Sequence, residues 1–173
     1  MMLATVYRGR RPRGGCLAAL LVALIGAAAA PAANAAPDSP FAAFFGEWVG
    51  GGEVAGTNGS SERIRCRASG ADAYDGAGLA QSIVCASPSY RIDIKCDVQA
   101  YGHNVSGAWR EDTRGASGRL TGTIAGGRFD GAVTGPSFTA DVQLQSNGRR
   151  QIVRIVPKGA DIADVKIELR RRD

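Results

Sequence analysis

Hydrophobic and polar residues alternate in short stretches along most of this chain. The clearest stretch is residues 90–98, where charged residues lie between the apolar positions Ile92, Ile94, Cys96 and Val98. Side chains of a β-strand point alternately to its two faces, so this stretch predicts a strand with one buried and one solvated face. Such strands are typical of an antiparallel sheet.

Turn-forming residues separate the alternating stretches roughly every ten residues, a spacing typical of all-β sandwiches and barrels. Tight turns are favoured at Asn58-Gly59 and Asn147-Gly148, and a longer glycine-rich loop is expected over residues 69–78. Because short turns join successive strands, we expect an antiparallel up-and-down β-barrel of about 8–10 strands, since closure leaves no exposed edge.

Each of the two tryptophans begins or ends an apolar face of an expected strand. In residues 46–54, Trp48 lies on one face while Glu47 and Glu53 share the other. The Trp48 face is the better core face, because it buries the aromatic ring and spares both carboxylates. Trp109 lies on a similar face, so we expect Trp48 and Trp109 to be core anchors. Glycines on the same faces either leave room inside the barrel or mark bends of the strands.

The motif Gly46-x-Trp48, which follows a short apolar turn at residues 41–45, resembles the N-terminal signature of lipocalins and other calycins. This resemblance implies a calycin-like barrel with an internal cavity. It also implies an arginine of a late strand packed near the tryptophan, for which Arg154 and Arg170 are candidates.

The chain is also similar to small secreted proteins of unassigned function from alpha-proteobacteria. That similarity rests on Cys66, Cys85, Gly107-Ala108-Trp109 and Gly135-Pro136-Ser137-Phe138. It implies secretion and brings no known activity.

The N-terminal segment has the features of a secretory signal peptide. Four arginines within residues 8–13 precede an apolar run over residues 16–30, and Ala33-Asn34-Ala35 follows. These are the charged, apolar and cleavage regions of such a peptide. We therefore expect a signal peptide over residues 1–35 and one β-barrel domain over residues 36–173, in the periplasm or secreted. The apolar run is too short for a membrane span.

Removal of this segment changes the charge balance of the chain. The whole sequence has 21 Lys and Arg against 16 Asp and Glu, a formal charge of +5. The four leader arginines account for most of that excess, so the remaining domain is nearly neutral. We expect no nucleic-acid partner, since such partners require a basic surface.

Three cysteines of the expected domain, Cys66, Cys85 and Cys96, all fall on inward faces. Simple hairpin registers place Cys66 opposite the middle of the next strand, so the pattern permits a disulfide without demanding one. The similarity to secreted proteins includes Cys66 and Cys85 but not Cys96. In an oxidising compartment we therefore expect a Cys66–Cys85 bond and a free, packed Cys96.

Familiar catalytic and metal-binding patterns are missing from the sequence. His103 is the only histidine and lies between turn-forming residues, so we expect neither a metal ion nor a cofactor such as haem. Glu47 and Glu53 would be about 20 Å apart on one strand, too far for a carboxylate pair acting on one bond. We therefore predict that the protein is not an enzyme.

Two functions agree with a secreted barrel of this kind. The first is a monomeric protein that binds a small apolar ligand inside the barrel. The alternative is an envelope or inhibitor-type protein that binds a protein partner through its outer surface. A small molecule that co-purifies with the protein would support the first function.

Overall fold

The computed structural model describes residues 39–137 and 139–173. The predicted signal peptide, residues 1–35, lies outside the described residues. Within the described ranges, no helix has the length and apolar character needed to cross a membrane.

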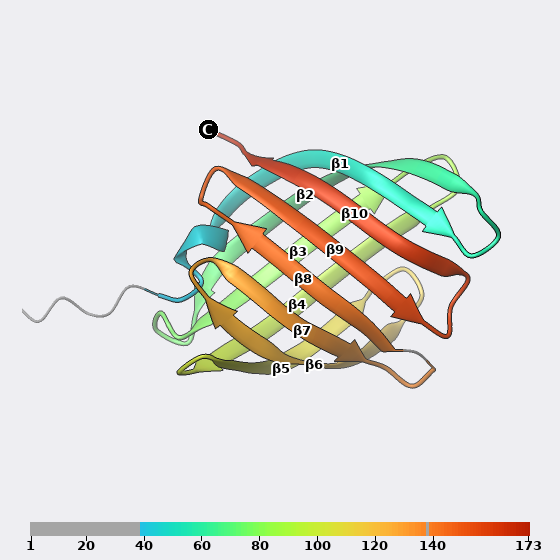
Figure 1. The fold of residues 1–173 in the computed structure, drawn as a ribbon. Coiled ribbons are helices and arrows are strands. Elements are labelled where there is room, and N and C mark those ends of the chain that lie inside the picture. Colours follow the sequence, from blue (N-terminus) through green and yellow to red (C-terminus); the bar gives the residue numbers. More distant parts are fainter. Residues whose placement is uncertain (1–38, 138) are drawn as a thin grey trace, which may run out of the picture. The chain divides into compact units, whose positions relative to one another are not determined.

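The described residues form a closed barrel of ten antiparallel strands (Figure 1). The strands are β1 Gly46–Gly56, β2 Ser61–Ala73, β3 Gly78–Ala86, β4 Arg91–Tyr101, β5 Asn104–Glu111, β6 Ala116–Ala125, β7 Arg128–Thr134, β8 Thr139–Ser146, β9 Arg150–Lys158 and β10 Ile162–Arg171. Each strand pairs with its neighbours in sequence, and β1 pairs with β10 to close the barrel. The predicted all-β, up-and-down barrel is confirmed.

A short 3₁₀ helix, η1 (Ala42–Phe44), lies at the end of the barrel where β1 begins (Figure 1). The indole N–H of Trp48 donates to the Phe44 carbonyl at 3.1 Å, and the Gln151 amide donates to the same oxygen at 3.4 Å. The Ser146 hydroxyl donates to the Ala43 carbonyl. Three strands thus hold η1 in place, and we call this end the closed end.

The long loop predicted over residues 69–78 is wrong. Strand β2 continues to Ala73, and the turn that follows contains Tyr74 and Asp75 with φ of 56° and 53°. Gly70 belongs to the strand, and a Cβ at this position would lie 2.3 Å from the Phe44 carbonyl oxygen. The glycine therefore lets η1 approach the strand and does not mark a turn.

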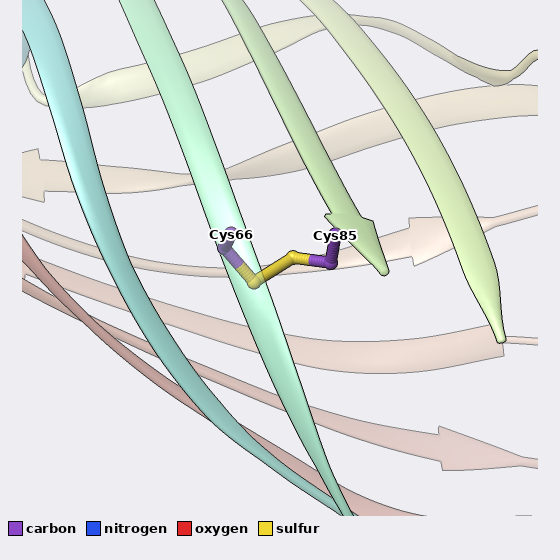
Figure 2. The surroundings of a disulfide bond; sticks show 2 residues. All are labelled: Cys66 and Cys85. Atoms are coloured by element: carbon purple, nitrogen blue, oxygen red, sulfur yellow. A yellow bond between two sulfur atoms is a disulfide. The ribbon is translucent and has the colours of Figure 1, made fainter. Parts of the chain in front are cut away.

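The longer β2 also changes the register of the cysteines. Cys66 lies directly opposite Cys85 on β3, and the two form a disulfide with 4.1 Å between their Cα atoms (Figure 2). The predicted register, which placed Cys66 opposite the middle of β3, is wrong because the turn lies at residues 74–77, so its centre is later in the chain than that of the predicted loop. Cys96 is free. A disulfide is compatible with an extracellular or periplasmic protein.

The core consists of two groups of buried side chains, one around each tryptophan. The Trp48 cluster comprises Trp48, Val54, Ile64, Cys66, Ala68, Cys85, Val153, Val165, Ile167 and Leu169. The Trp109 cluster comprises Phe41, Phe44, Leu79, Val98, Val105, Trp109, Leu120, Ile124, Phe129 and Val142. The exposed fractions are 0% for Trp48 and 6% for Trp109.

The arginine that packs on the first tryptophan is Arg171, and the two predicted candidates are wrong. Its guanidinium carbon lies 5.7 Å from the centroid of the Trp48 ring. Arg171 is the register partner of Trp48 and shares its face of the sheet with buried Leu169. Arg154 instead forms an ion pair with Asp164 on the outer face. The contact is a cation–π interaction at the closed end.

Candidate functional site

The barrel contains a cavity of ≈ 150 Å³ on the side of the Trp109 cluster. It extends between strands β3 to β9, and η1 forms part of its wall. The lining residues are Phe41, Phe44, Leu79, Gln81, Ile83, Ile94, Cys96, Val98, Trp109, Leu120, Ile124, Phe129, Val133, Ala140, Val142, Leu144, Val153, Ile155 and Pro157. All of these side chains except Gln81 are apolar or carry only a weakly polar thiol or indole group, so the cavity favours apolar contents.

The two ends of the cavity differ in exposure. Phe41 and Phe44 at the closed end are 2% and 1% exposed. Several lining residues toward the opposite end are half-buried, namely Ile83, Ile94, Val133, Ile155 and Pro157, whereas Ala140, the register partner of Val133 and Pro157, is buried. We call this second end the open end. It faces the turns after β3, β5, β7 and β9.

The inward glycines do not make this cavity. A Cβ at Gly50 would lie 2.0 Å from the Glu168 carbonyl oxygen, and one at Gly52 would lie 1.9 Å from that of Lys166. These positions therefore serve the close approach of β1 to β10. The glycines were expected either to leave room inside the barrel or to mark bends of the strands. The contacts favour bends, because no glycine lies among the described lining residues.

Gln81 is the polar group in the cavity wall. Its side chain is 7% exposed, and its amide nitrogen Nε2 has no hydrogen-bond partner among the described residues. The strand register places Gln81 opposite Cys96 on β4, and Cys96 opposite Trp109 on β5. The Trp109 indole N–H donates to the Thr134 carbonyl at 3.1 Å. An amide, a thiol and an indole ring thus lie side by side on one wall.

Cys96 is a free thiol on this wall, and burial raises its pKa to about 11. The thiol is therefore protonated near neutral pH. Because the thiolate is the nucleophilic form, Cys96 reacts slowly under those conditions.

The raised pKa predicts how alkylation of Cys96 depends on pH. The rate with iodoacetamide should rise about tenfold per pH unit from pH 7 to pH 10, since the thiolate fraction grows by that factor well below the pKa. Peptide mapping by mass spectrometry measures the rate at this residue, and circular dichroism checks that the barrel stays folded. A rate that levels off below pH 9 would contradict the buried, protonated thiol.

A buried carboxylate, Glu111, lies at the open end but not in the cavity lining. It is 7% exposed and accepts hydrogen bonds from the backbone N–H groups of Asp93, Thr113 and Arg114 at 3.1, 3.0 and 2.7 Å. These bonds fix the turn between β5 and β6. Glu111 therefore shapes the rim of the cavity.

The residues expected to matter from the sequence divide between core and cavity. Trp109 lines the cavity, whereas Trp48, Cys66 and Cys85 lie outside its lining. The sequence analysis placed Cys96 on an inward face without assigning it to a site, and it did not single out Gln81. The available signal was Gln81 itself, a polar residue on an otherwise apolar inward face of its strand.

Comparison with known proteins identifies the fold. No family model matches the sequence, and no curated protein matches it either. The crystal structure of Rv2717c from M. tuberculosis matches with a TM-score of 0.62 and 11% identity, over 76% of this chain and 94% of that one. The S-type phycobiliprotein lyase CPES from Guillardia theta matches with a TM-score of 0.54 and 11% identity, over 77% and 90%. Both are calycin-like barrels, as the Gly46-x-Trp48 motif implied.

The prediction that the protein is not an enzyme, which was based on missing sequence motifs, is wrong. One of the two similar structures is named a phycobiliprotein lyase, so barrels of this fold include a protein named as an enzyme. The missing sequence motifs belong to other folds and do not rule out catalysis here. At 11% identity, the similarity shows the fold alone.

Proposed function

We propose that the protein binds a small apolar ligand inside the barrel. The observation that carries this proposal is the cavity of ≈ 150 Å³ with its almost entirely apolar lining. Apolar surface that is kept free of side chains inside a folded protein lacks the packing contacts that fill most cores. A ligand that enters from the open end makes those packing contacts, and its own apolar surface is removed from water.

The volume limits the size of the ligand. An apolar cavity of about 150 Å³ holds a molecule the size of benzene, whereas sites for drug-sized ligands are about 300–1,000 Å³. The ligand is therefore a single ring or short chain, or one end of a longer molecule that leaves through the open end. A whole haem group is too large for this cavity.

The outer surface supports the alternative function less well. The large hydrophobic side chains exposed in the described part of the chain are Tyr74, Tyr101 and Ile152. Tyr74 and Tyr101 are neighbours, but two tyrosines and a separate isoleucine do not make the large contiguous apolar patch that marks an interface. We therefore favour the ligand over a protein partner.

The leader and the cysteines support a place of action outside the cytoplasm. We propose that residues 1–35 are a cleaved signal peptide and that residues 36–173 act as a monomer in the periplasm or outside the cell. The Cys66–Cys85 disulfide supports an oxidising compartment. The likeness to secreted alpha-proteobacterial proteins stays a prediction.

Thermal unfolding with toluene as the probe tests ligand binding. A ligand at 100 times its dissociation constant stabilises the folded state by about 2.7 kcal/mol, so the melting temperature should rise by several degrees. Ala140→Leu should abolish this shift, because Ala140 lines the cavity and is 1% exposed. Ala108→Leu is the matched control, since Ala108 is exposed on the outer face of β5. A melting temperature that toluene leaves unchanged, or raises equally in Ala140→Leu, would contradict the proposal.

A further inference from the structure

We infer that the ligand is an uncharged molecule with an apolar body and one hydrogen-bond acceptor, such as a carbonyl oxygen, which the side-chain amide of Gln81 binds. This inference rests on the proposed function and specifies the class of its ligand.

The burial of Gln81 calls for a partner. Most buried polar side-chain groups in proteins make at least one hydrogen bond, because desolvation without a replacement bond is unfavourable. Gln81 is 7% exposed, its Nε2 has no partner among the described residues, and the residue lines the cavity. A ligand in the cavity is therefore the partner that the folded protein leaves room for.

Gln151 provides a useful contrast. It is also buried, at 0% exposed, and its Oε1 lacks a partner among the described residues. However, its Nε2 donates to the Phe44 carbonyl, and it lies outside the cavity lining. Gln151 thus has a structural role in holding η1, a role that Gln81 does not share.

The side chains beside Gln81 are not strong donors toward a ligand, so the Gln81 amide is the group that would bind the ligand's polar atom. Cys96 carries a protonated thiol, which is a weak donor. Trp109 donates its indole N–H to the Thr134 carbonyl. Gln81 Nε2 is therefore the strong donor on this wall, and a strong donor selects an acceptor atom in the ligand.

The absence of charged groups among the described lining residues favours a neutral ligand. None of the described lining residues is ionised near neutral pH. Glu111 at the rim is acidic, and its oxygens accept three backbone N–H groups. A carboxylate inside the cavity would be desolvated without a counter-ion, which disfavours binding strongly. A ketone, aldehyde, ester or amide satisfies Gln81 without that cost.

Two probes of nearly identical shape test this inference. Acetophenone carries a carbonyl oxygen where α-methylstyrene carries a methylene group, so only acetophenone can accept a hydrogen bond. Their dissociation constants are measured by calorimetry for the wild type and for Gln81→Met, which keeps the length of the side chain and removes the amide. We expect the substitution to weaken acetophenone binding about fivefold to tenfold, the effect of one net hydrogen bond, and to change α-methylstyrene binding less than about twofold.

Further measurements separate this role from a structural one. Gln81→Met should be at least as resistant to denaturant as the wild type, because it removes a buried amide without a partner. Gln145→Met, on the exposed outer face of β8, should leave both affinities unchanged. Benzoate should not bind at concentrations that saturate the site with acetophenone.

Each result has a distinct meaning. Equal effects of Gln81→Met on both probes, or tight binding of benzoate, would overturn the inference while the ligand-binding function stood. A wild-type protein that bound neither acetophenone nor α-methylstyrene would overturn the proposed function and the inference together.

Discussion

Replacement of Trp48 by alanine is expected to lower the free energy of unfolding by about 3–5 kcal/mol, the range for emptying a large buried aromatic site. The side chain is 0% exposed and its indole N–H donates to the Phe44 carbonyl. The guanidinium carbon of Arg171 lies 5.7 Å from the centroid of the ring. The substitution therefore opens the core and also removes one of the three side-chain hydrogen bonds that hold η1 at the closed end. Equilibrium unfolding in guanidinium chloride measures the change.

Trp109→Ala should cost a similar amount, since Trp109 is 6% exposed, and it should also enlarge the cavity that this ring lines. Trp48→Phe serves as the control, because it keeps most of the apolar volume and removes only the N–H donor. Its effect should be clearly smaller than that of Trp48→Ala. If both alanine variants unfolded at the denaturant midpoint of the parent, the assignment of the tryptophans as core anchors would be wrong.

Loss of the disulfide is the second large expected effect. Cys66 and Cys85 are 19 residues apart in sequence, and a cross-link that closes a loop of this length stabilises by about 3 kcal/mol when it restricts the unfolded chain. The double variant Cys66→Ala/Cys85→Ala should lose about that much, as measured by the same unfolding experiment.

Cys96→Ala is the matched control for this pair. It removes one buried sulfur and leaves the cross-link intact, so its cost should be well below that of the double variant. Peptide mapping without reductant should show the Cys66 and Cys85 peptides joined and Cys96 available for alkylation. A peptide that joins Cys96 to either partner would reject the pairing.

The alternation of apolar residues was sufficient to predict which side chains face inward. In β4, the inward positions were predicted from period two alone, and the structure places Val98 in the core and Cys96 and Ile94 in the cavity wall. This succeeds because the pleat of a strand fixes the face of each side chain locally. The closed, antiparallel order of strands then follows from short turns.

Register and contacts across the barrel could not be predicted in the same way. Gly70 resembled a turn residue, yet its small size accommodates the Phe44 carbonyl, which lies 26 residues earlier in the chain. The position of the turn after β2 determines that Cys66 pairs with Cys85. The register of the last strand determines that Arg171 packs on Trp48. Such features depend on residues that are distant in sequence.

The cavity is a feature of the same non-local kind. Gln81 lies on the inward face of β3, but the space beside it exists because side chains of β3 to β9 and η1 do not meet in the middle. No local pattern contains that information. The Trp48 side of the barrel has the same alternation and is filled by its own cluster.

A crystal structure of the protein soaked with iodobenzene tests the central claim, that the barrel holds a small apolar ligand, most directly. Iodobenzene is close in size to the benzene-like ligands that an apolar cavity of about 150 Å³ accepts, and its iodine atom gives an anomalous signal. We expect one dominant anomalous peak inside the barrel, in contact with the wall formed by Gln81, Cys96 and Trp109. A cavity without a peak, with iodine bound only on the outer surface, would contradict the account.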